Sequence, residues 1–355
     1  MTYNRFGTPR AYVDLISYHL ATGWRDLNDI TILQDDGSTA VTFNSNTHKA
    51  NLFDMKPHKY AQIDDATKRF YITIDTGLSS PDSLAESNFI AILNHNMADA
   101  DVSFNLKIDD ASDFGSATTV SASGAHNKII NAEQNTESGY TNHIHPEHNG
   151  WTLITWNTSE SDNRYARIGF TKKDSATQNF SEDLILGGIL WGEYIDFPQS
   201  PDLEIKTSVV YDNVSLNQSV SGSTYANSPS FGAPTWNHTT PWSLSDAGGD
   251  SSAYSFLQKH GRTNHSLKFS YLSDTEVYAR SAGSGTSSYW FDDSSLHASF
   301  YNRIIGQQLP FLFTPDGTST GENNYGLFRL ANDNFTANQV AHRIWNTSLD
   351  LVETW

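Results

Sequence analysis

The chain has 355 residues, more than a single hydrophobic core usually serves, so its length favours two domains. It has no cysteine, which excludes disulfides, thiolate metal ligands and a thiol nucleophile. Its formal net charge of −18 disfavours nucleic acid, because binding to phosphates requires a surplus of lysine and arginine. We also expect a soluble protein without membrane insertion, since no apolar run reaches spanning length and residues 1–5 do not begin a signal peptide.

Residues 1–35 allow two interpretations. Val13, Ile16 and Leu20 have the spacing of one helical face, and Gly23 stands where a helix would end. The same stretch is compatible with an extended arm that packs on a neighbour. We therefore assign residues 1–35 to an N-terminal arm or a short helix and leave the choice open.

From about residue 40 the hydrophobic pattern changes to a period of two, which is typical of β-strands. Apolar and polar residues alternate in residues 70–75 and again, strictly, in residues 102–109, which predicts two strands with one buried face. Residues 89–93 are continuously apolar, which indicates a strand buried on both faces. Further strands are expected at residues 151–156, 166–170 and 184–194. The pattern predicts a jelly-roll-like β-sandwich over residues 36–198.

Pro198 and Pro201 mark the predicted domain boundary, because two prolines within four residues stop a strand and stiffen a linker. Strands are expected after the boundary, around residues 211–225, 267–271, 310–314, 325–330 and 345–355. We found no repeat of fixed period, which disfavours propellers and solenoids. Residues 199–355 are therefore predicted to form a second β-sandwich or barrel-like domain, and the whole chain to be all-β.

The histidine cluster at residues 143–148 is a weak candidate metal site. His143 and His145 are two residues apart on an extended segment, so their side chains point the same way and can share a metal ion. Against this, Pro146 interrupts the segment, and a polar chain with thirteen histidines will cluster some by chance. We favour a solvated loop here, and we assign the protein neither a metal nor a cofactor.

No catalytic signature is present in the sequence. Ser284 lies in a Ser/Gly loop without the glycine spacing of a nucleophile elbow. The forty Asp and Glu residues offer many carboxylate pairs, but none has the apolar surroundings that raise the pKa of a general acid. We therefore predict that the protein is not an enzyme.

Two sets of residues are candidates for binding. Asn94, His95 and Asn96 follow the apolar strand at a loop and can contact a sugar, although Asn side chains also close turns, which is the interpretation we favour. Three tryptophans are candidate interface anchors, since Trp is enriched at the energetic centres of interfaces, and ordinary core positions are an equal alternative for them. They are Trp236, Trp242 and Trp355.

Parts of the chain resemble known families. Residues 70–77 and 89–96 resemble the core of a discoidin-like, galactose-binding jelly roll, and residues 164–170 are similar to its penultimate strand. Residues 261–272, 309–316 and 353–355 resemble tail or tail-tip proteins of tailed bacteriophages. The resemblance covers residues 60–110, 150–195 and 205–355. The sugar-binding residues of discoidin-like lectins have no counterparts here, so none is carried over.

This resemblance implies a virion structural protein of a tailed phage, assembled in the host cytoplasm into part of the tail or distal tail tip. Its expected partners are itself, in a homo-oligomeric ring or tube, and other virion proteins. Such assembly uses large symmetric interfaces, which suits a chain without a catalytic signature. The alternative is a carbohydrate-binding, receptor-recognition module of a fibre or spike that binds a host surface glycan. An enzyme that degrades host glycan is the third and least favoured hypothesis.

Overall fold

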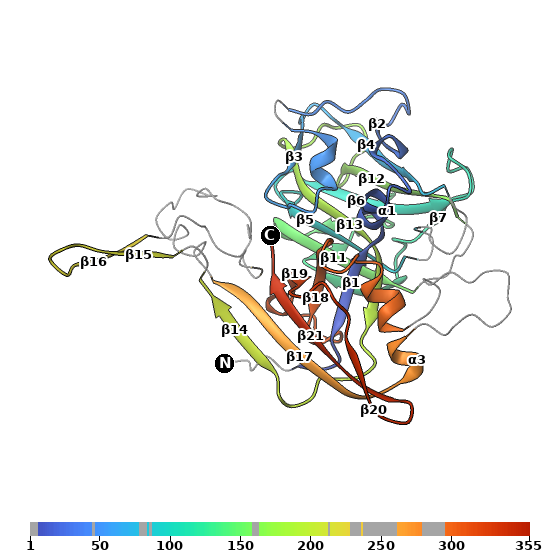
Figure 1. Ribbon diagram of the computed structural model, residues 1–355. Coiled ribbons are helices and arrows are strands. Elements are labelled where there is room, and N and C mark those ends of the chain that lie inside the picture. Colours follow the sequence, from blue (N-terminus) through green and yellow to red (C-terminus); the bar gives the residue numbers. More distant parts are fainter. Residues whose placement is uncertain are drawn as a thin grey trace.

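The computed structural model describes residues 6–44, 47–77, 84, 87–157, 163–211, 214–227, 236, 261–278 and 295–355. In this part of the chain, antiparallel strands form a 12-stranded sheet, a 7-stranded sheet and a separate two-stranded hairpin (Figure 1). The prediction of an all-β protein is confirmed. None of the described helices is long and apolar enough to cross a membrane.

The large sheet contains strands from most of the length of the chain. Its strand order is β14-β17-β21-β19-β18-β1-β13-β5-β11-β8, with β20 paired to β21 and β3 to β13. Its strands are β1 (Arg10–Asp14), β3 (Ala61–Ile63), β5 (Phe89–His95), β8 (His126–Ile130), β11 (Gly150–Trp156), β13 (Leu184–Asp196), β14 (Lys206–Val210), β17 (Arg262–Ser273), β18 (Phe311–Thr314), β19 (Gly326–Leu330), β20 (Ala337–Ala341) and β21 (Ile344–Glu353).

The small sheet has the order β2-β4-β12-β6-β10-β9, with β7 paired to β6. Its strands are β2 (Ile30–Gln34), β4 (Arg69–Asp75), β6 (Val102–Asp109), β7 (Thr118–Thr119), β9 (Ala132–Gln134), β10 (Ile144–Pro146) and β12 (Tyr165–Lys172). The hairpin consists of β15 (Ser215–Gln218) and β16 (Thr224–Asn227).

Helices are short and few in the described chain. They are α1 (Leu15–Thr22), α3 (Asp274–Val277), a π-helix (Leu296–Tyr301) and 3-10 turns at Leu27–Asp29, Lys49–Leu52 and Glu322–Asn324. The carboxylate of Asp14 accepts from the backbone N–H groups of Ile16 and Ser17 and so caps α1. Gly23 ends the helix with a φ of 71°, the left-handed conformation that glycine adopts most readily. Residues 15–22 are thus helical, whereas Val13, which the spacing placed on the same helical face, belongs to strand β1.

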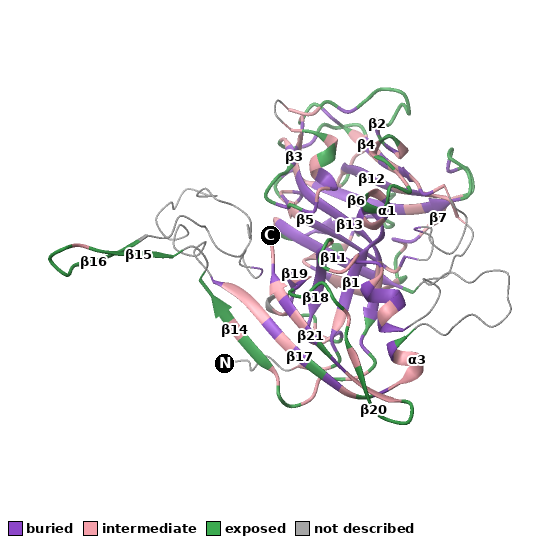
Figure 2. Ribbon diagram, in the orientation of Figure 1, coloured by how far each residue is buried: buried purple, intermediate pink, exposed green. Residues whose placement is uncertain are grey.

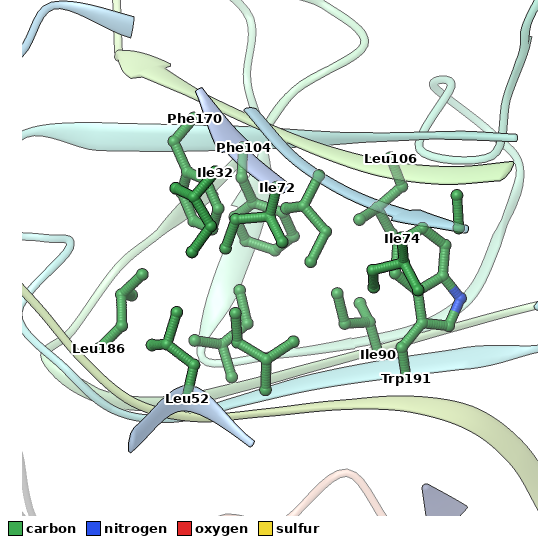
Figure 3. Packing of buried hydrophobic residues seen from close by; sticks show 14 of the residues in the cluster. Ile32, Leu52, Ile72, Ile74, Ile90, Phe104, Leu106, Phe170, Leu186 and Trp191 are labelled. Atoms are coloured by element: carbon green, nitrogen blue, oxygen red, sulfur yellow. The ribbon is translucent and has the colours of Figure 1, made fainter. Parts of the chain in front are cut away.

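The main core lies between the two sheets. Ile72 of β4, Phe104 of β6 and Phe170 of β12 point from the small sheet toward Ile90 and Trp191 of the large one (Figure 3). The alternation in β6 places Phe104 and its apolar neighbours in this core, but Ser103, Asn105 and Asp109 on the other face are buried as well, so the prediction of a single buried face is wrong for this strand. The first unit is therefore a two-layered β-sandwich, the architecture that the resemblance implied.

The large sheet is buried on both faces along β5 (Figure 2). Ile90 and Ile92 belong to the sandwich core, whereas Phe89 and Leu93 pack on the opposite side with Trp151. Residues 89–93 are continuously apolar because the side chains on both faces of β5 are buried. The prediction of a strand buried on both faces is confirmed.

The predicted boundary after residue 198 lies within one continuous sheet. Strand β1 pairs with β13 on one side and with β18 on the other, so the N-terminal segment joins the strands before and after Pro198. A further core, with Phe269, Phe300, Phe311 and Phe313 among its members, lies beneath the C-terminal strands.

Candidate functional site

A concavity in the described structure lies on the outer face of the small sheet. It is a pocket of about 540 Å³ above β2, β4 and β12, closed on one side by the loop after β6. A volume of this size lies within the range of roughly 300–1,000 Å³ typical of small-molecule sites. Seven of the side chains that line it bear aromatic rings or charges: Tyr71, Tyr165, Asp29, Asp35, Asp75, Asp113 and Arg167.

The strand registers place the pocket side chains in parallel rows. Thr31, Thr73 and Arg167 lie opposite one another on β2, β4 and β12. A second row contains Leu33, Tyr71 and Gly169, and a third pairs Asp75 with Tyr165. Their neighbours along each strand are buried in the sandwich core, so alternation alone turns these residues outward.

Arg167 forms the floor of the pocket and is held on several sides. Its guanidinium lies 3.8 Å from the ring centroid of Phe114 and 5.0 Å from that of Tyr71. Its Nε donates to Oγ1 of Thr73 at 3.1 Å. Stacking between two rings fixes the plane of the guanidinium, a geometry that lysine cannot reproduce.

Gly169 makes room for the Tyr71 ring. A Cβ at residue 169 would lie 3.2 Å from that ring and 2.4 Å from Oδ1 of Asn105, closer than side chains tolerate. The missing side chain lets the tyrosine lie across β12, next to Arg167. One glycine in the middle of a strand thus shapes the pocket floor.

The carboxylates of the pocket are engaged by neighbouring donors. The hydroxyl of Tyr71 donates to Asp35 at 2.8 Å, and burial together with this bond raises the pKa of Tyr71 to about 12. Arg164 contacts both oxygens of Asp75 at 2.6 Å, and these hydrogen bonds hold the pKa of Asp75 below its ordinary value. A glycosidase acid requires the opposite shift, so this carboxyl is suited to accepting hydrogen bonds from a ligand.

The pocket therefore combines fixed donors, fixed acceptors and ring faces. Arg167 supplies guanidinium N–H groups, and the carboxylates of Asp29, Asp35 and Asp113 supply acceptors. The Tyr71 and Tyr165 rings supply flat apolar surface. Four carboxylates and one arginine line the pocket, and three of the carboxylates have further arginine partners: Asp75 with Arg164, Asp35 with Arg69 and Asp29 with Arg25.

The candidate metal residues lie elsewhere on the small sheet. His143 and His145 flank the core residue Ile144 and are only 8 % exposed, because β10 pairs with both β6 and β9. They are thus buried rather than in a solvated loop, and burial lowers the pKa of His143 to about 4. Neither belongs to a group of three metal-ligating side chains in the described chain.

One group of three such side chains occurs in that part of the chain, formed by Asp64, Asp65 and Asp183. The oxygens of Asp183 already accept hydrogen bonds from Asn44, from Gln62 and from the backbone of Asp65. Their geometry is that of a loop held together by a carboxylate, and we assign no metal to it.

The side chains of the candidate sugar-binding residues, Asn94, His95 and Asn96, contact other segments of the sandwich. Nδ2 of Asn94 donates to the carbonyl of Pro57, and Asn96 contacts both Glu182 and the backbone of Ile185. His95 is buried, and its Nε2 lies 2.9 Å from Oγ1 of Thr152. These partners lie far along the chain, so Asn94 and Asn96 join separate segments instead of closing a local turn, and sugar binding by this loop stays a prediction.

The three candidate tryptophans differ in position. Trp236 is buried, its ring centroid is 5.3 Å from that of Trp151, and its carbonyl accepts from Nε1 of Trp151. Trp355 is half-buried beneath the guanidinium of Arg262. Trp242 lies outside the described residues. Trp236 thus serves the core of this chain, and an interface role for Trp355 stays a prediction.

The pocket residues were not predicted as a site. The alternation in residues 70–75 and 166–170 predicted strands only. The polar side of these strands carries Tyr71, Asp75 and Arg167. A strand face that contacts only water does not need side chains of this size and hydrogen-bonding capacity, so these residues could have indicated a site. The sequence does not show the register in which β2, β4 and β12 pair, so it could not show that these residues meet.

Comparisons with known proteins gave distant structural similarity only. No family model and no curated protein matches the chain. A CBM32 module produced by Clostridium perfringens, in complex with GlcNAc-α-1,4-galactose, is 12 % identical with a TM-score of 0.28 and covers 46 % of this chain and 87 % of its own. A chitosan-binding module from a chitosanase/glucanase of Paenibacillus sp. IK-5 is 14 % identical with a TM-score of 0.27, covering 45 % and 91 %. CBM32-1 from a family 31 glycoside hydrolase of C. perfringens is 12 % identical with a TM-score of 0.29, covering 46 % and 94 %. With every one of these TM-scores below 0.5, the function has to be argued from the pocket itself.

Proposed function

We propose that the protein binds carbohydrate in the pocket on the outer face of the small sheet. A sugar ring presents hydroxyls around its edge and C–H groups on its faces, so it needs hydrogen-bonding groups and flat apolar surface side by side. The observation that carries the proposal is the Arg167 guanidinium, fixed between Phe114 and Tyr71 and surrounded by carboxylates. These groups are held in place before a ligand arrives, which lowers the entropic cost of binding.

The net charge of the chain selects among sugars. The pocket lining contains four carboxylates, three of them paired with arginines, and the chain as a whole carries a net charge of −18. Acidic sugars are therefore repelled, whereas neutral and amino sugars are accepted. We expect binding to neutral or amino oligosaccharides and none to uronic or sialic acids.

Tyr165→Ala tests the site, since it removes one aromatic wall of the pocket without touching the core. We expect a glycan identified on an array to bind this variant at least tenfold more weakly, about 1.4 kcal/mol, by titration calorimetry. Tyr60→Ala is the matched control, because Tyr60 is an exposed tyrosine that does not line the pocket. Equal losses in both variants, or no binding by the wild type to any glycan, would contradict the proposal.

Assembly as a structural protein of a phage tail or tail tip is a second candidate function. One observation favours an assembly role, namely the exposed apolar hairpin β15–β16 that projects from the molecule. A virion location and partners within a tail remain part of this proposal. Negative-stain imaging of the purified protein tests it: rings or tubes of fixed multiplicity support it, and dispersed single molecules at high concentration contradict it.

A further inference from the structure

The hairpin β15–β16 stands away from the two sheets and has no core of its own (Figure 1). Every residue of β15 is exposed (Figure 2). Leu216 of β15 and Tyr225 of β16 are 68 % and 64 % exposed. A two-stranded hairpin without a packed face is marginally stable in water, so this one needs a surface to pack against.

The hairpin and the segment before it expose several large apolar side chains among polar ones, and this segment leads directly from the edge of the large sheet. Strand β14 directly precedes the hairpin in the chain and pairs with β17 only, so its other edge carries no described strand. Exposed apolar side chains follow one another along this segment, and we call them the arm surface: Val209, Val210, Tyr211, Val214, Leu216, Val220 and Tyr225.

The hairpin and its immediate flanks are also free of charge, and Asp212 is the one charged residue between Val209 and Asn227. Residues 213–227 contain no Asp, Glu, Lys, Arg or His, in a chain that is 17 % charged. Two copies that each carry a net charge of −18 repel one another over most of their surfaces. An uncharged segment held away from the body is the place where two copies can meet without bringing like charges together.

We propose that the arm surface is a self-association element, which packs against the arm surface of a second copy of this chain. Identical strands pair antiparallel across a two-fold axis, and the edge of β14 that no described strand occupies, together with the edges of the hairpin, offers backbone groups for such pairing. Contact between two arms buries Leu216 and Tyr225, which the isolated chain leaves in water.

Light scattering of the full chain across a concentration series tests the proposal. The wild type should have a mass of at least twice 39.5 kDa, and Leu216→Glu combined with Tyr225→Glu should reduce it to a single chain. Both side chains are exposed, so the fold survives, which an unchanged far-ultraviolet circular dichroism spectrum verifies. Val340→Glu is the matched control, because Val340 is an exposed valine on β20 outside the arm surface, and this variant should keep the mass of the wild type.

Cysteine crosslinking supplies a second readout, because the natural chain has no cysteine. Asn217→Cys, at an exposed position of β15, should give a disulfide-linked dimer under mild oxidation. Ser38→Cys, exposed in the turn after β2, should remain uncrosslinked. A monomeric wild type at every concentration, an arm variant that keeps its oligomeric mass, or equal crosslinking at residues 38 and 217 would overturn the proposal.

Discussion

Buried histidines link the stability of this protein to pH. Burial lowers the pKa of His95 to about 3 and that of His143 and His265 to about 4. An unfolded histidine titrates near 6.5. The folded state therefore binds fewer protons than the unfolded state below about pH 6.5, so stability is present at neutral pH and is lost as the pH falls toward the folded pKa values.

His95→Gln isolates one of these contributions. Between pH 7.5 and pH 5, titration of His95 should cost the wild type about 2 kcal/mol of unfolding free energy, since one pKa unit corresponds to about 1.4 kcal/mol. The variant should lose about that much less over the same interval, as measured by urea unfolding. His148→Gln, at an exposed histidine, is the control and should match the wild type. Identical pH dependence in His95→Gln and wild type would contradict this account.

At the scale of elements, the pairing of β1 with β13 depends on Gly192. A Cβ at residue 192 would lie 2.0 Å from the carbonyl oxygen of Val13, a backbone atom that cannot move aside. The same region is fixed by Asp14, whose carboxylate accepts from the backbone N–H of Trp191 while it caps α1. Asp14 thus links the β1–β13 pair to helix α1.

Gly192→Ala should lower the unfolding free energy by about 3 kcal/mol, the upper range for overpacking, because β1 must shift away from β13. Gly188→Ala offers a close control in the same strand, since the nearest atom to a Cβ there is 3.9 Å away. We expect the control to change stability by less than about 1 kcal/mol in urea unfolding. Comparable losses in both variants would refute the packing argument.

The elements were predictable where one face is plainly apolar, as in β4, because its periodicity is local. The pocket was not predictable, since Tyr71 and Arg167 are 96 positions apart by number and meet only through the pairing of β4 with β12. Burial of His143 and His145 was missed for the same reason: β6 and β9, not the local sequence, enclose β10.

At the scale of the whole molecule, contacts cross the predicted boundary at residue 198 in several places. Nζ of Lys128 donates to the carbonyls of Gly317 and Ser319, and Arg303 forms an ion pair with Glu193. With β1 between β13 and β18, the two parts share one sheet. Because the two parts share one sheet, we expect them to unfold together as one cooperative unit.

We therefore expect one calorimetric unfolding transition for the full chain. Deletion of residues 1–14 should remove the partner of both β13 and β18 and abolish this transition altogether. Deletion of residues 1–5 alone should leave it in place. Two separate transitions in the wild type, or a folded protein without β1, would show that residues 36–198 and 199–355 fold as independent domains.

The central claim is that the outer face of the small sheet binds carbohydrate, and nuclear magnetic resonance tests it most directly. A neutral or amino oligosaccharide that binds on an array is titrated into isotope-labelled protein, and the shifted backbone signals are mapped. The account predicts saturable shifts centred on Tyr71, Tyr165 and Arg167. Shifts centred on the loop at residues 94–96 instead, or no saturable shifts at all, would contradict it.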